Sequence, residues 1–319
     1  HFPAQQVGMV DTDKSEERCI VFVASDRSKG AYYFYDRTAD RVELLTEVAP
    51  WLPESAMAPM HPVTFTTRDG LTIEAYLSLP PGLTLDALPA PLPVIVNPHG
   101  GPWSRDNWGF SSEVQFLCSR GYAVFQLNLR GSTGYGRDFL EKSYKQWGLT
   151  MQNDITDGVH WLIDSGIADP KRIAIYGASY GGYATLAGAC FTPELYCCAI
   201  DYVGVSNLLT FLQTIPPYWR AMLDMMYEQI GHPDRDRAQL EATSPALHAD
   251  AIRCPLFIAQ GANDPRVNKD ESDQMVAALR RRGVEVEYMV KDNEVHGFAN
   301  QENVCDFYRA VERFLQQHL

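Results

Sequence analysis

A serine flanked by glycines is the residue of this sequence that points most directly to chemistry. Ser179 is the central residue of Gly-Ala-Ser-Tyr-Gly, a G-x-S-x-G pattern at residues 177–181. An apolar run precedes it at 172–176, and small side chains without proline follow it. This order predicts a strand, a sharp turn and a tightly packed helix, the setting in which the pattern forms a nucleophile elbow. The glycines allow a strained turn that exposes the hydroxyl, and an ordinary glycine-rich β–α turn is the alternative.

A serine hydroxyl needs a base to act as a nucleophile, and the base needs a carboxylate that orients it. In α/β-hydrolases the acid and then the histidine follow the serine, each after a late strand. Asp264 follows the apolar run 256–259, and His296 follows the run 286–290. We therefore predict Ser179, Asp264 and His296 as the catalytic residues. The competing residues are out of order, precede the strand or fall in predicted helices: His160, His232, His248, His318, Asp250, Asp270 and Asp273.

Acyl transfer also needs hydrogen-bond donors for the oxyanion of the tetrahedral intermediate. Asn97-Pro-His-Gly-Gly-Pro102 follows the apolar run 94–96 and is similar to loops that supply one such backbone N–H. Gly101 is the predicted donor, because Pro102 has no N–H. The second predicted donor is the N–H of Tyr180, directly after the nucleophile. We interpret His99 as a structural hydrogen-bonding residue, and a simple Pro-Gly turn is the alternative for the whole loop.

Strand and helix signals alternate along the chain from about residue 60 onwards. Asp69-Gly70 lies between alternating arms and predicts a hairpin. The predicted strands after it lie at 94–96, 123–127, 173–175, 198–200, 256–259 and 286–290. The predicted helices lie near 112–120, 150–166, 180–191, 236–242, 270–282 and 303–317. This pattern predicts an α/β fold of the α/β-hydrolase type, with a mostly parallel sheet and helices on both faces.

Residues 1–60 show a sequence pattern that differs from that of the rest of the chain. Three β-prone runs, at 19–23, 31–35 and 41–45, are separated by turn-rich stretches, which is typical of a β-meander such as part of a propeller blade. We predict a β-rich segment over 1–60 and a catalytic domain over 61–319. A unit this small has little core and unpaired edges. We expect it to pack on the hydrolase body, to end a longer β domain, or to contact a second copy in a homo-oligomer.

Composition argues against several classes of partner. The net charge of −13 disfavours nucleic acid and anionic membranes, and no apolar run approaches the ~18 residues of a membrane helix. The seven cysteines are scattered without a C-x-x-C pair, and the eight histidines show no metal spacing. We therefore expect no disulfide framework, no metal, no cofactor and a cytoplasmic location. The glycines of 130–136 do not form G-x-G-x-x-G, so this stretch predicts a turn before a helix and not a nucleotide site.

Together these motifs resemble the prolyl oligopeptidase family of serine hydrolases, closest to its acylaminoacyl-peptidase branch. The matching stretches follow the family's order over 62–319: 99–102, 128–136, 177–183, 203–207, 215–219, 261–268 and 296–298. The resemblance implies the triad and oxyanion roles given above to the same residues. It also implies a multi-bladed propeller before the hydrolase domain, whereas residues 1–60 match only part of one blade. Aminopeptidase specificity is therefore not implied.

The expected function is a serine peptidase that cleaves small peptides or esters through an acyl-enzyme. A promiscuous carboxylesterase is one alternative because its acyl-enzyme chemistry is the same, and an assembly fragment without significant catalysis is another. Arg266 is expected to bind a substrate carbonyl, with ion pairing inside its own loop as the alternative. Apolar residues from 203 to 219 are predicted to line the acyl-side pocket, with simple packing as the alternative: Val205, Leu208, Leu209, Phe211, Ile215, Tyr218 and Trp219.

Overall fold

The computed structural model describes residues 1–319 and divides into two compact units. One unit comprises His1–Pro62, Tyr76–Leu88 and Asn107–Val124. The other comprises Val63–Ala75, Pro89–Asp106 and Phe125–Leu319. The division after residue 60 that the sequence suggests stays a prediction.

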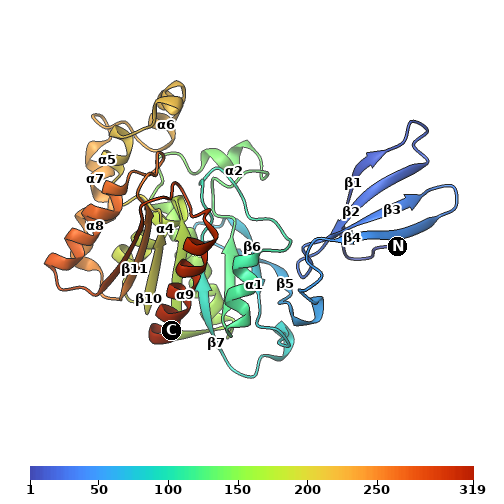
Figure 1. Ribbon diagram of the computed structural model, residues 1–319. Helices are drawn as coiled ribbons and strands as arrows, with labels where there is room; N and C mark the ends of the chain where they lie inside the picture. The colour runs from blue at the N-terminus through green and yellow to red at the C-terminus, as the bar shows by residue number, and fades with distance from the viewer. The chain divides into compact units, whose positions relative to one another are not determined.

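The elements follow one another as labelled in Figure 1. The strands are β1 (Gln6–Thr12), β2 (Arg18–Ala24), β3 (Ala31–Asp36), β4 (Arg41–Glu47), β5 (Met60–Thr66), β6 (Thr72–Ser78), β7 (Leu92–Val96), β8 (Ala123–Leu127), β9 (Ala168–Ala178), β10 (Cys198–Tyr202), β11 (Leu256–Gly261) and β12 (Val286–Lys291). The α-helices are α1 (Ser112–Ser119), α2 (Arg137–Glu141), α3 (Thr150–Asp164), α4 (Tyr180–Phe191), α5 (Leu208–Gln213), α6 (Leu223–Gln229), α7 (Arg237–Ala242), α8 (Lys269–Arg281) and α9 (Gln301–His318). Short 3-10 helices lie at Glu54–Ala56, Leu85–Ala87, Pro217–Met222, Pro245–Leu247 and Ala249–Ala251.

The N-terminal sheet has four antiparallel strands in the order β1-β2-β3-β4. Its core is small, with three buried residues of β2 on which Phe2 and side chains of β3 pack: Cys19, Val21 and Val23. The sequence predicts β2, β3 and β4 but not β1. Every residue of β1 is exposed, so β1 lacks the buried alternation that marks a strand in a sequence.

The second sheet has eight strands in the order β12-β11-β10-β9-β7-β8-β6-β5. Strands β7, β9, β10, β11 and β12 pair in parallel, which confirms the predicted α/β fold. The predicted hairpin joins β5 to β6. In its turn the Thr67 N–H donates to the Leu71 carbonyl at 2.9 Å, and Gly70 takes a φ of +84° that suits glycine.

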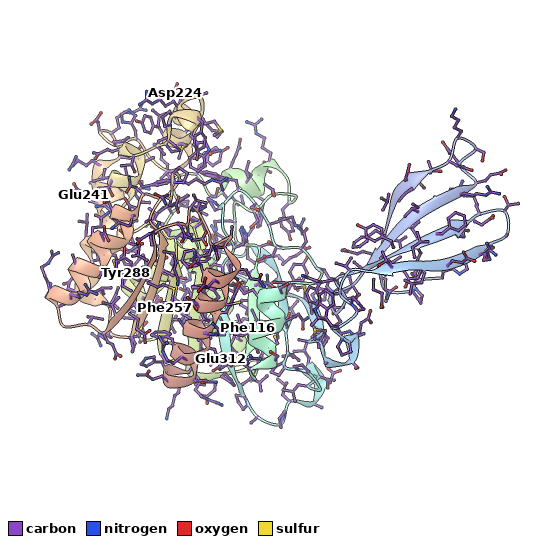
Figure 2. The ribbon with its side chains drawn as sticks, in the orientation of Figure 1. Phe116, Asp224, Glu241, Phe257, Tyr288 and Glu312 are labelled. Atoms are coloured by element: carbon purple, nitrogen blue, oxygen red, sulfur yellow. The ribbon has the colours of Figure 1, made fainter.

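Neighbouring residues of β9 show that helices cover both faces of this sheet. Ile175 lies against Gly188 of α4, whereas Tyr176 contacts Phe307 of α9 at 6.4 Å between ring centroids. Successive strand residues point to opposite faces, so α4 and α9 lie on opposite sides (Figure 1). Phe257 of β11, labelled in Figure 2, packs on Phe307 and Phe314 of α9, with the ring centroids 5.9 Å apart in both pairs. A helix therefore covers each face of a central strand such as β9, as the continuous apolar runs in the sequence predict.

Two short helices, α5 and α6, are absent from the sequence-based prediction. They have six and seven residues, too few for a helical period to stand out. None of the helices in the structure combines the length and the apolar character needed to cross a membrane.

A buried carboxyl in β10 gives a testable pH dependence. Asp201 is fully buried, and this burial raises its pKa from 3.8 to about 7 although the Gly204 N–H opposes the shift. The unfolded chain thus loses this proton at lower pH than the folded chain, and the folded state loses stability as pH rises from about 4 to about 7. In Asp201→Asn the free energy of unfolding should vary less between pH 5 and pH 8, by roughly 1–3 kcal/mol. Urea unfolding of both proteins at the two pH values measures this, and an unchanged difference would contradict the assignment.

Candidate active site

Ser179 lies in a strained turn between β9 and α4. It has φ 60° and ψ −117°, a backbone conformation that residues other than glycine rarely adopt. The glycines on either side are needed for close packing. A Cβ on Gly177 would lie 2.4 Å from the Gly181 carbonyl oxygen, and a Cβ on Gly181 would lie 2.1 Å from that of Pro98. The turn therefore has the form of the nucleophile elbow that the pentapeptide predicts.

The three predicted catalytic side chains meet at this turn. His296 Nε2 lies 3.0 Å from Ser179 Oγ, and His296 Nδ1 lies 2.7 Å from Asp264 Oδ2. A carboxylate accepts hydrogen bonds, so Nδ1 carries the proton and Nε2 is free to accept one from the serine. Ser179, Asp264 and His296 follow β9, β11 and β12, at the carboxyl ends of parallel strands.

The Asp264 carboxylate is held on both of its oxygens. Oδ1 accepts the backbone N–H groups of Arg266 at 2.8 Å and Val267 at 3.0 Å, while Oδ2 faces His296. The Asp264 side chain is fully buried and 13% of the His296 side chain is exposed. The carboxylate is thus fixed toward the imidazole before any substrate binds.

The competing acids lie elsewhere. Asp273 accepts a hydrogen bond from Tyr288 at 2.7 Å, and Asp250 pairs with Arg282 at 3.2 Å. Asp270 is exposed in the first turn of α8. None of these three carboxylates is bonded to His296.

The loop predicted to bind the oxyanion lies against the elbow. A Cβ on Gly100 would lie 3.3 Å from the Ala178 carbonyl oxygen and 3.7 Å from Ser179 Cβ. Gly101, Ser179 and Tyr180 line one cavity. Tyr180 is the first residue of α4. The first N–H groups of a helix have no partner within the helix, so the Tyr180 donor is available.

His99 fastens this loop, as interpreted from the sequence. Its Nδ1 lies 2.7 Å from the Gly100 carbonyl oxygen and its Nε2 lies 2.8 Å from Ser132 Oγ. A carbonyl only accepts, so Nδ1 is the protonated nitrogen. Burial lowers the pKa of His99, which favours the neutral ring. His99 has no contact with Ser179 that would give it a part in proton transfer.

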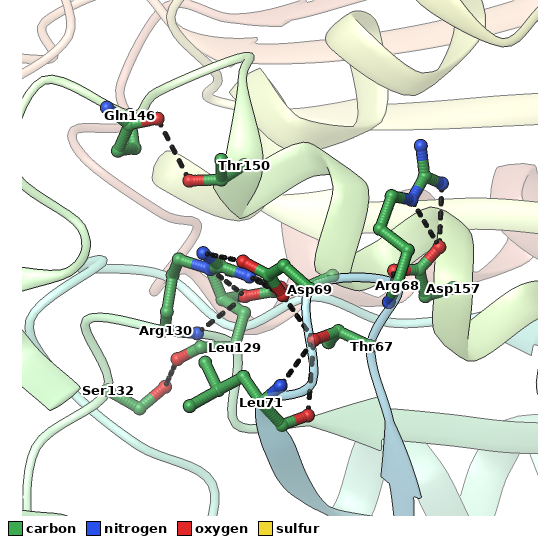
Figure 3. A network of polar contacts seen from close by, with 11 residues as sticks. Thr67, Arg68, Asp69, Leu71, Leu129, Arg130, Ser132, Gln146, Thr150 and Asp157 are labelled. Atoms are coloured by element: carbon green, nitrogen blue, oxygen red, sulfur yellow. Dashed lines mark hydrogen bonds and ion pairs between the residues drawn. The ribbon is translucent and has the colours of Figure 1, made fainter.

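Arg130, two residues before Ser132, is the centre of an ion network, and the Ser132 hydroxyl donates to the Leu129 carbonyl at 2.7 Å (Figure 3). Arg130 binds Asp154 at 2.6 Å and Asp69 at 2.8 Å, and its backbone N–H donates to Asp154 at 2.9 Å. The ion pair with Arg130 and a hydrogen bond from Thr67 hold the pKa of Asp69 below its usual value. The stretch 130–136 therefore serves structure, and α2 begins directly after it at Arg137, which confirms the predicted turn before a helix.

An apolar cavity of about 230 Å³ opens beside Ser179. Four of the predicted substrate residues line it: Val205, Phe211, Trp219 and Arg266. The others do not. Leu208 and Leu209 are buried in the packing of α5, Tyr218 is 59% exposed, and Ile215 lines a separate depression. Seven further apolar residues complete the wall: Trp103, Trp147, Met222, Met225, Met226, Ile230 and Val267.

Only some of the missed lining residues had a signal in the sequence. Trp103 follows the oxyanion loop directly, so its position beside the serine follows from that loop. Trp147 is brought in by tertiary packing, with its ring 4.6 Å from Tyr180 and 5.1 Å from Tyr183 between centroids. No group of three or more His, Cys, Asp or Glu side chains is arranged to hold a metal ion.

The fold and the Ser179–His296–Asp264 arrangement define an α/β-hydrolase. Residues 108–319 match the model of the prolyl oligopeptidase family, and the chain belongs to that family. It is 41% identical over 305 residues to dipeptidyl aminopeptidase BIII of Pseudoxanthomonas mexicana, covering 94% of this chain and 44% of that protein. It is 32% identical over 208 residues to the acylamino-acid-releasing enzyme of Arabidopsis thaliana, covering 64% of this chain and 27% of that one.

Solved structures show the same likeness. The puromycin-hydrolyzing peptidase of Mycobacterium tuberculosis superposes with a TM-score of 0.84 at 31% identity, covering 95% of this chain and 46% of that chain. The chain thus spans about half, or less, of the length of the proteins that it matches.

Proposed function

We propose that this chain carries the hydrolase part of a serine peptidase that cleaves peptide bonds next to an apolar residue. The observation that carries the proposal is the continuous hydrogen-bonded chain from Asp264 through His296 to Ser179 at the mouth of an apolar cavity. The names of its relatives, a dipeptidyl aminopeptidase and an acylamino-acid-releasing enzyme, support peptides as the substrate class.

In the proposed reaction Ser179 Oγ attacks the substrate carbonyl carbon while His296 Nε2 takes the hydroxyl proton. The backbone N–H groups of Gly101 and Tyr180 hold the oxyanion of the tetrahedral intermediate. The leaving amine takes the proton from His296 as the C–N bond breaks, which leaves an acyl-serine. Water then attacks the acyl-serine with His296 again as the base, and the acid product and free Ser179 are released.

The cavity would receive the side chain on the acyl side of the scissile bond. Its wall is made of aromatic rings and methionines, so it favours an apolar side chain and disfavours a carboxylate. Arg266 is the one cationic residue of the wall. In the proposed complex its guanidinium donates to a substrate carbonyl, while its backbone N–H holds Asp264.

A matched panel of substrates tests the proposal. Acyl-peptide and dipeptidyl nitroanilides with Phe or Asp before the scissile bond are compared with p-nitrophenyl esters of the same acids. A peptidase of the proposed kind cleaves the Phe nitroanilides and rejects the Asp ones. Turnover of esters alone would favour the carboxylesterase instead.

Two neighbouring aromatic residues allow the cavity to be distinguished from the nearby surface by mutation. Trp219 lines the cavity, whereas Tyr218 is exposed outside it. Trp219→Ala should lower kcat/KM for the Phe substrate by roughly 10–100-fold, because the side chain loses part of its apolar wall. Tyr218→Ala should leave kcat/KM within about twofold of the original value, since a lone surface change has little effect. Equal effects of the two changes in steady-state assays would argue against this cavity as the binding site.

A further inference from the structure

The loop that carries His296 contains a second, almost completely buried acid. Residues 292–300 connect β12 to α9, and Glu294 stands two positions before His296. Only 3% of Glu294 is exposed. An ionisable side chain is rarely buried this far unless hydrogen bonds compensate for the lost water.

The Glu294 carboxylate joins the two ends of the loop 292–300 that carries His296. Oε2 accepts the Ala299 N–H at 2.9 Å, and Oε1 accepts the Asn300 N–H at 2.9 Å and the Asn303 side-chain amide at 2.7 Å. His296 lies between the two ends that the carboxylate joins. Burial opposes the charged form, but these hydrogen bonds hold the pKa of Glu294 below its usual value, so the acid is ionised.

The backbone of Glu294 joins the same loop to the loop that carries Asp264, residues 262–268, here called the acid loop. The Glu294 carbonyl accepts the N–H of Asn263 at 2.9 Å, and Asn263 directly precedes Asp264 in the chain. The contact leaves no space for a side chain, since a Cβ on Gly261 would lie 2.1 Å from the Val295 carbonyl oxygen and 2.9 Å from that of Glu294. On the far side of His296 the Phe298 N–H donates to the Tyr202 hydroxyl of β10.

We propose that Glu294 is a positioning residue that sets His296 between Asp264 and Ser179. Its backbone joins the acid loop, and its carboxylate fixes the return of the chain into α9. The imidazole therefore has little freedom to turn away from either partner. The proposal rests on the proposed serine-peptidase function, because its effect is on proton transfer by His296.

The predicted consequence is a loss of kcat with little change in KM. Glu294→Gln keeps the size of the side chain but turns one accepting oxygen into a donor that faces N–H groups. We expect kcat to fall about 10–100-fold, because small misplacements of a reacting group have effects of that size. KM should stay within about twofold, since no residue that lines the substrate cavity is altered. Glu302→Gln is the matched control, a change of the same kind at an exposed position in the first turn of α9.

A second variant covers the case in which Glu294→Gln does not fold. Asn303→Leu removes one of the three hydrogen bonds and leaves the carboxylate charged, so kcat should fall less, by about 3–10-fold. Thermal unfolding, kcat and KM are measured for each protein. In both variants the loss should fall on kcat and not on KM, whereas Glu302→Gln should keep the original values of both.

The outcomes separate this proposal from the function on which it rests. An original protein that hydrolyses no substrate defeats the proposed function itself. An active original protein with unchanged kcat in folded Glu294→Gln and Asn303→Leu overturns the positioning role. A loss confined to KM, or an equal loss in Glu302→Gln, overturns it as well.

Discussion

Ser179→Ala is expected to lower kcat by at least ~10³, leaving only the hydrolysis that the oxyanion donors and substrate binding support without a nucleophile. The hydroxyl is the only group removed, and it serves as hydrogen-bond partner of His296 alone. The fold should persist, because alanine fills the same space in the elbow. Steady-state hydrolysis of a Phe nitroanilide measures the loss, and circular dichroism with thermal unfolding tests the fold.

Retained activity in the Ser179→Ala variant would contradict the assignment of Ser179 as the nucleophile. A folded Ser179→Ala protein with more than a tenth of the original kcat would show that another group performs the attack.

Asp264→Asn should lower kcat by up to ~10⁴ with a small change in KM. The carboxylate accepts hydrogen bonds from His296 and from the Arg266 and Val267 backbone N–H groups. An amide has one accepting oxygen, so its NH₂ group must face one of these donors. If it faces His296, the imidazole takes the tautomer that cannot accept the serine proton.

Asp270→Asn is the matched control for this change. Asp270 is exposed in the first turn of α8, near Asp264 in the sequence but without a bond to His296. Its replacement should leave kcat within about twofold, as for most surface substitutions. Comparable losses in the two variants, each measured with saturating substrate, would show that Asp264 has no special role.

The positions of the three predicted catalytic residues could be read from the sequence for a physical reason. Each follows an apolar run, and parallel strands bring their carboxyl ends to one edge of a sheet. Ser179, Asp264 and His296 therefore converge once the strands are identified, although they are far apart in the chain. The glycines around Ser179 add a local signal, because the close approach of Gly181 to Pro98 allows no side chain.

The cavity was less predictable, because its walls come from segments without a local signal. Trp147 precedes α3 and reaches the site by packing on Tyr180 and Tyr183. The methionines of 222–226 lie in short helices that show no clear period. Conversely, Leu208 has the same apolar character as Val205 but faces the protein core. Residue type alone does not distinguish a side chain that lines a cavity from one that fills the core.

Ionic contacts inside the protein were also not predictable. The sequence predicts only a turn at Arg130, but in the structure Arg130 anchors that turn through Asp154 of α3 and Asp69 of the β5–β6 hairpin. Glu294 has no neighbour in the sequence that signals its burial. Both depend on which loops meet in space, and that is decided by the packing of the whole sheet.

Labelling with a fluorophosphonate tests the central claim most directly, because only an activated serine displaces fluoride from phosphorus at a useful rate. The probe is added to the original protein, to Ser179→Ala and to His296→Ala, and intact mass and peptide mapping locate the adduct. We predict one adduct per chain on Ser179 in the original protein, none in Ser179→Ala, and labelling at least ~10²-fold slower in His296→Ala. A modified residue other than Ser179, or an undiminished rate without His296, would contradict the account.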